Sequence, residues 1–113
     1  MIKMIRYSIH IKVEPNDKRY ARELMNFRGD CEADDVYSRA AALEEILRRK
    51  NVEESFSVVY IGQQQATDER LALDAGQQLK LAETRPQIEN KSEIELCRLL
   101  EGFKYDGLHH YIG

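Results

Sequence analysis

The chain has 113 residues, a usual length for one domain, and we expect a single α+β domain over residues 1–113. Hydrophobic residues make up 42% and charged residues 33%, which is too apolar for a disordered chain and too charged for a membrane protein. No apolar run approaches the roughly 20 residues of a transmembrane helix, and the first residues lack a secretory signal. We therefore expect a cytoplasmic location, no membrane partner, and reduced thiols at Cys31 and Cys97.

The net charge of −3 is unevenly distributed along the chain. Residues 1–28 hold seven Lys and Arg against three Asp and Glu, a balance of +4. Residues 29–113 hold ten against seventeen, a balance of −7. This asymmetry favours a charged partner or self-association.

The first predicted element is a half-buried strand over residues 5–13, where apolar and polar residues alternate. After Pro15 we predict a helix over residues 16–28, because Tyr20, Leu24 and Phe27 share a helical spacing and Gly29 suits a helix C-terminus.

A second helix is predicted from Asp34 or Asp35, which would cap it, to Lys50. Its apolar stripe runs from Val36 to Leu47, and three cations close its last turn. The stretch 55–61 is β-branched and aromatic on both faces, which predicts a strand in the centre of the sheet.

Residues 67–85 fit two structures. As a helix, the stretch would have Thr67 as its cap, Leu79 on its apolar face and Pro86 after its end. As a hairpin, it would turn at residues 74–77. We favour the helix, although Gly76 weakens it by about 1 kcal/mol relative to Ala.

The last predicted helix begins with the capping box formed by Ser92 and Glu95. The apolar tail 107–112 is expected to return as a short strand. The predicted order is β-α-α-β-(α or hairpin)-α-β. This order corresponds to a two-layer domain with a small, mostly antiparallel sheet and three or four helices on one face.

The polar face of the first strand gives the candidate binding site. If the helices cover only the other face, the cationic side chains of this strand and of the following segment form an open basic surface. That surface would consist of Arg6, His10, Lys12, Lys18, Arg19 and Arg22. It could contact phosphates or an acidic protein, and we favour a protein because the whole domain is acidic.

The tail holds the candidate catalytic residues His109, His110 and Asp106. Histidine titrates near neutrality and serves as a general acid or base, with a carboxylate to orient it. Adjacent residues of a strand point to opposite faces, so only one of the two histidines can face a given site.

Other patterns are too incomplete to define a site. Residues 30–35 begin like a calcium loop, but Asp35 and Ala41 stand where such a loop needs glycine and glutamate. The loop 62–67 has one glycine and is followed by acidic residues, which excludes a phosphate loop of the usual kind. We expect no metal, no cofactor and no catalytic cysteine: carboxylates around Cys31 suppress its thiolate, and Cys97 should be buried in a helix.

Three functional hypotheses follow. The favoured one is a small non-enzymatic regulator, an inhibitor or adaptor, that binds another macromolecule through charged surfaces. The second is a small hydrolase or nuclease that uses His109, His110 or His10 with Asp106. The third is a homodimer that pairs through an exposed sheet edge or the open face, and a nucleic-acid-binding module is less favoured.

Overall fold

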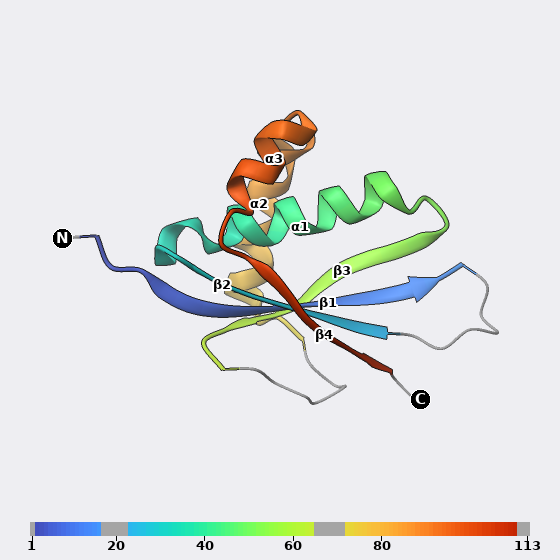
Figure 1. The fold of residues 1–113 in the computed structure, drawn as a ribbon, viewed down its shortest axis with the longest axis horizontal. Coiled ribbons are helices and arrows are strands. Elements are labelled where there is room, and N and C mark those ends of the chain that lie inside the picture. The colour runs from blue at the N-terminus through green and yellow to red at the C-terminus, as the bar shows by residue number, and fades with distance from the viewer. Residues whose placement is uncertain (1, 17–22, 65–71, 111–113) are drawn as a thin grey trace.

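The computed structural model describes residues 2–16, 23–64 and 72–110. The described strands are β1 (Ile5–Pro15), β2 (Glu23–Cys31), β3 (Glu54–Gly62) and β4 (Lys104–His110). The helices are α1 (Val36–Lys50), α2 (Ala75–Glu89) and α3 (Glu93–Leu99), with a short 3-10 turn (Ala33–Asp35) before α1 (Figure 1).

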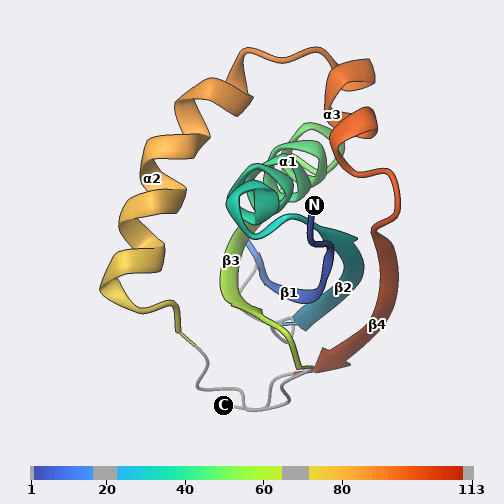
Figure 2. The ribbon, with the colours of Figure 1, turned by 90° about the vertical axis from the view of Figure 1, so that its left-hand side faces the viewer.

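The four strands form one sheet in the order β3-β1-β2-β4, and all three neighbouring pairs are antiparallel. Figure 2 shows the sheet curving around α1, with α2 on the side of β3 and α3 on the side of β4. All three α-helices therefore lie on one side of the sheet. The predicted α+β class, with a small antiparallel sheet and helices on one face, is confirmed.

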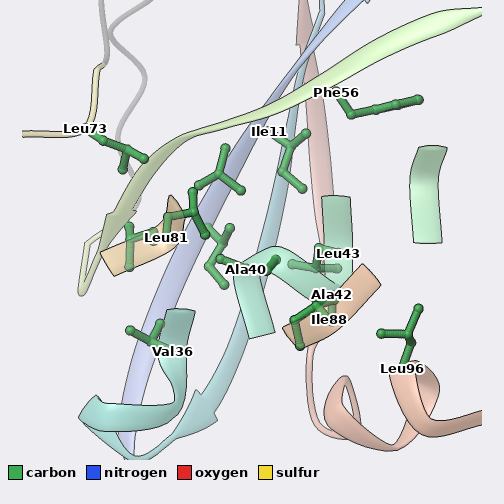
Figure 3. Close-up of a cluster of buried hydrophobic side chains, with 14 of the residues drawn as sticks. Ile11, Val36, Ala40, Ala42, Leu43, Phe56, Leu73, Leu81, Ile88 and Leu96 are labelled. Carbon is green, nitrogen blue, oxygen red and sulfur yellow. The ribbon is translucent and has the colours of Figure 1, made fainter. Parts of the chain in front are cut away.

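The core lies between the sheet and the helices (Figure 3). Ile9 and Ile11 of β1 are fully buried against Ala40 and Leu43 of α1 and against Leu81 of α2. The alanines of α1 leave room for the sheet to approach closely, while α2 and α3 close the sides with Ile88 and Leu96. Burying these side chains contributes about 1.5–3 kcal/mol for each large one.

The strand predicted over residues 5–13 is confirmed, but the helix predicted over residues 16–28 is wrong. Residues 23–31 form β2, which pairs with β1 from Ile5↔Cys31 to Val13↔Glu23. Leu24 and Phe27 lie on opposite faces of this strand, although their spacing also fits one face of a helix. Hydrogen bonding to β1 decides between the two structures, and Tyr20 lies outside the described residues.

Strand β3 is an edge strand, so the prediction that residues 55–61 form a central strand is wrong. The apolar residues on its two faces have different packing partners. Phe56, Val58 and Ile61 face the helices, and Tyr60 packs on the opposite face against His10. Val59 is the extra residue of a bulge, because the register shifts between His10↔Tyr60 and Ile11↔Val58.

The helical alternative for residues 67–85 is correct, but its bounds and its buried face differ from the prediction. Asp74 is the N-cap and forms a capping box with Gln77, whereas Thr67 lies outside the described residues. Pro86 lies inside the helix instead of after it. Leu79, predicted to be buried, is 61% exposed, and the buried positions of α2 are Leu81 and Ile88.

The remaining predicted elements are confirmed. Helix α1 buries Val36, Ala40 and Leu43 and ends on three cations. The capping box of α3 is present, with the Glu95 amide donating to Ser92 Oγ at 3.2 Å and the Ser92 amide donating to Glu95 Oε1 at 3.1 Å. The tail returns as β4, which begins three residues earlier than predicted. No helix within the described residues is long and apolar enough to cross a membrane.

Candidate functional site

The sheet face opposite the helices is the candidate site, and we call it the outer face. Because side chains alternate along a strand, it carries the even-numbered residues of β1 and β2. These are Arg6, Ser8, His10, Lys12, Glu14, Leu24, Asn26, Arg28 and Asp30. The strand register aligns them in rows across the sheet, and β4 adds Lys104 opposite Arg28.

His10 lies on the outer face but is fully buried, so its predicted place on an open basic surface is wrong. Its ring is 4.9 Å from the ring of Tyr60 on β3, centroid to centroid. On the other side it is paired in register with Asn26 of β2. The polar alternation placed His10 on the correct face but did not reveal what packs over it.

Two of the predicted binding residues form ion pairs. Arg6 donates from Nε to Asp30 Oδ1 at 3.0 Å and from Nη2 to Oδ2 at 3.3 Å. Lys12 Nζ lies 2.6 Å from Glu14 Oε1. Both pairs are at least partly exposed. Each carboxylate therefore offsets part of the positive charge of its cation, but the pair holds the side chains only weakly. Lys18, Arg19 and Arg22 lie outside the described residues.

Arg28 and Lys104 belong to the outer face, and neither was among the predicted binding residues. They are directly opposite one another on β2 and β4, and Arg28 is also opposite Ser8 on β1. Neither cation forms an ion pair within the described part of the chain. In the sequence, Leu24, Asn26 and Arg28 follow the two-residue period of a strand. This period was overlooked because the stretch was interpreted as a helix.

Two uncharged polar side chains lie beside this pair of cations. Ser8 and Asn26 are fully buried, and Ser8 Oγ, Asn26 Oδ1 and Asn26 Nδ2 have no hydrogen-bond partner among the described residues. Arg28 Nε is also buried without a partner there. A buried polar atom without a hydrogen bond costs about 1–3 kcal/mol, so this row stands out from the rest of the sheet.

The candidate catalytic residues lie on β4. The register aligns His109 with Leu24 and His110 with Glu23. The side chains of both histidines lie outside the described part of the structure. Asp106 is the extra residue of a bulge, since the register jumps from Phe27↔Tyr105 to Asn26↔Gly107. His10 is in neither of the rows of His109 and His110, because it is paired in register with Asn26.

A buried carboxylate joins the two layers on the other side of the sheet. Glu44 of α1 is fully buried and accepts from the Val58 amide at 2.8 Å, at the bulge of β3. Arg85 of α2 donates to it from Nε and Nη2, both at 2.9 Å, and Arg48 donates at 3.3 Å. The carboxylate raises the pKa of Arg85 by hydrogen bonding. This network fixes α2 and β3 to α1.

A cavity of about 430 Å³ lies beside this network, between β3 and α2. Val58, Val59, Leu73 and Leu81 supply apolar walls, and Arg85 supplies a cation. The guanidinium is already bound to Glu44 by two hydrogen bonds, so the cavity has little charge left to select a ligand.

Neither the acidic segment nor the cysteines form a recognisable site. Among the residues that the structure describes, no group of three His, Cys, Asp or Glu could hold a metal ion. Asp30 is paired with Arg6. Asp35 is the N-cap residue of α1, but its side chain accepts no hydrogen bond from the first turn, so the predicted side-chain cap is wrong. Burial raises the pKa of Cys31, Arg39 opposes this rise, and the nearby carboxylates add to it. Cys97 is exposed, so its predicted burial is wrong.

Comparisons of the chain with protein-family models, with curated proteins and with solved structures found no match.

Proposed function

We propose that this protein is a small non-enzymatic interaction protein, an inhibitor or adaptor, that binds an acidic surface of another protein through its outer face. The observation that supports the proposal is the one-sided arrangement of the fold. All three α-helices pack on one face of the sheet, and the other face carries Arg6, Lys12, Arg28 and Lys104 on three neighbouring strands.

The charge of this face differs from that of the whole chain. The net charge is −3, yet four cations gather on the outer face, and two of them have no ion pair within the described ranges. A local positive field on an acidic protein steers an acidic partner to one face and repels it from the others. Such a contact is screened by salt, with a Debye length of about 10 Å at 0.1 M.

Capture from an extract of the native cells tests the proposal. The bait is the full chain, and the test variant carries Arg6→Glu and Lys12→Glu on the outer face. The matched control carries Lys80→Glu and Arg98→Glu on α2 and α3, which changes the net charge equally on the helical side. Partners should be lost with the outer-face variant and in 0.5 M NaCl, and retained by the control.

Capture that survives both the reversal and the salt contradicts the proposal. Equal loss with the helical control also contradicts it, because net charge would then matter and the outer face would not. A partner population that is removed by nuclease treatment indicates nucleic acid instead of an acidic protein.

The enzyme hypothesis is less favoured, because the ring of His10 is buried against the ring of Tyr60. Replacing each of the three histidines by alanine would distinguish it: an enzyme loses turnover, whereas an interaction protein keeps its partner if it stays folded. The homodimer hypothesis has one supporting feature. Strand β4 is a sheet edge with no described strand beyond it. Light scattering on the purified chain measures its mass directly.

A further inference from the structure

We propose that Ser8, Asn26, Arg28 and Lys104 form a binding site for one phosphate group, carried by a phosphorylated side chain of the partner protein. This inference rests on the proposed function, because the phosphate would anchor the partner to the outer face. It adds a chemical class of ligand and a defined position on the sheet.

Two cations of the outer face lie opposite one another on neighbouring strands. Arg28 and Lys104 are directly opposite on adjacent antiparallel strands, where like charges destabilise the pair. Elsewhere on this face the cations of β1 have carboxylate neighbours, Asp30 for Arg6 and Glu14 for Lys12. An anion between Arg28 and Lys104 would turn the repulsion into two charge-assisted hydrogen bonds.

Polar atoms without a hydrogen-bond partner among the described residues lie beside these cations. Ser8 is opposite Arg28 in the register, and Asn26 is two residues along β2 on the same face. Their side chains are fully buried, and Ser8 Oγ and Asn26 Nδ2 have no partner within the described residues. A hydroxyl, an amide and a buried guanidinium Nε–H are donors that suit phosphate oxygens.

A ligand can approach this row of side chains from the β4 end. Arg28 is half-buried and Lys104 is exposed at the rim, so the row runs from a buried floor at Ser8 to an open end at β4. The nearest carboxylate along β4 belongs to Asp106, which is set apart by the bulge. The site therefore holds one anion at the open end, away from that carboxylate.

The described residues favour a single phosphate group over a nucleic-acid backbone. A nucleic-acid surface needs cations in a track and aromatic rings free for stacking. On the outer face Tyr60 is packed against His10, and Tyr105 is turned to the other face, where it contacts Phe27. The chain as a whole is acidic.

The test is an NMR titration of the full chain with inorganic phosphate, with the ionic strength held constant by NaCl. The amides of Ser8, Asn26, Arg28 and Lys104 should shift and saturate. Arg28→Gln and Lys104→Gln should each weaken binding about tenfold, the usual effect of losing one charge-assisted hydrogen bond. Arg6→Gln is the matched control, because it also removes one positive charge from the outer face. Arg6 is already paired with Asp30, so this variant should change the phosphate affinity less than twofold.

Two further arms identify the source of the phosphate. A phosphoserine peptide should bind more tightly than inorganic phosphate, and its unphosphorylated form should not shift these amides. Lys104 is exposed, so its variant tests the site even if Arg28→Gln unfolds, and Arg28→Lys keeps the charge while removing the planar fork.

Three results would overturn the inference: no saturable shift, equal weakening by Arg6→Gln and Lys104→Gln, or a single-stranded oligonucleotide that binds the same residues more tightly than the peptide. The titration contains no partner protein. A failed titration with partner capture still sensitive to Arg6 and Lys12 rejects the phosphate site alone. Loss of that sensitivity rejects the proposed function.

Discussion

At the scale of single residues, Glu44 is the side chain on which the layers depend most. It accepts from the Val58 amide beside the β3 bulge and from Arg85 and Arg48. The sequence contains no sign of this role, because Glu44 lies next to Glu45 in an ordinary charged helix. Its burial follows from the position of the bulge, which is a feature of strand pairing and not of the helix.

Replacing Glu44 by alanine should therefore lower the free energy of unfolding by about 1–3 kcal/mol, because the buried Val58 amide loses its acceptor and the partly exposed Arg85 loses its carboxylate partner. Glu45→Ala is the control one residue away, where the ion pairs with Arg48 and Arg49 are partly exposed and the cost is about 1 kcal/mol or less. Urea unfolding measures both. Equal costs for the two variants would show that the buried network is not essential.

Gly29 has a second specific role. We predicted that it ends a helix, but in β2 it allows the ring of Phe103 to lie against the strand. A Cβ at this position would be 2.5 Å from Phe103 Cγ. Gly29→Ala should cost about 1–3 kcal/mol through overpacking. Combining it with Phe103→Leu should restore part of that loss, and a double-mutant cycle from urea unfolding measures the coupling. Strictly additive costs would rule out the contact as the cause.

At the scale of elements, local signals in the sequence found α1, α2 and α3, but they missed the strand β2 and predicted a helix in its place. The capping box of Ser92 and Glu95 and the apolar stripe of α1 depend on residues within one or two turns, so the sequence alone contains them. Strand β2 depends on β1 for its hydrogen bonds, and a spacing of three between Leu24 and Phe27 fits a helix equally well. The missed strand also concealed Arg28 and with it half of the candidate site.

The caps provide a prediction at this scale. Ser92→Ala should lower the free energy of unfolding by about 1 kcal/mol, because the Glu95 amide loses its acceptor at the start of α3. Asp74→Ala should have a similar effect on α2, where Gln77 has the same pairing. Ser92→Asp serves as the control, because it still accepts from the Glu95 amide and should retain most of the stability. Urea unfolding measures all three, and a full loss in Ser92→Asp would contradict the capping explanation.

At the scale of the whole molecule, the sequence predicted the layers but not the order of the strands. Alternation in β1 indicated one covered face and one polar face, and the helices do cover a single face. Alternation does not indicate which strands lie at the edges, so the apolar β3 was expected at the centre and is found at the edge. It also does not show how deeply the polar face is covered, which is why the burial of His10 was missed.

Acid should weaken the fold through two carboxylates at the ends of its elements. Hydrogen bonds from Arg6 lower the pKa of Asp30, and hydrogen bonds from Ser92 lower the pKa of Glu95. A carboxyl whose pKa is lower in the folded state contributes stability above its unfolded pKa of about 4 and loses that contribution as the pH falls through the folded value. The free energy of unfolding should therefore fall as the pH is lowered from about 5 toward 2.

Asp30→Asn should be less stable than wild type at pH 6, and the two should converge at low pH, because both then lack the Asp30 charge. Urea unfolding across this range measures the difference, and a gap between wild type and variant that stays constant with pH would show that the Arg6–Asp30 pair does not contribute.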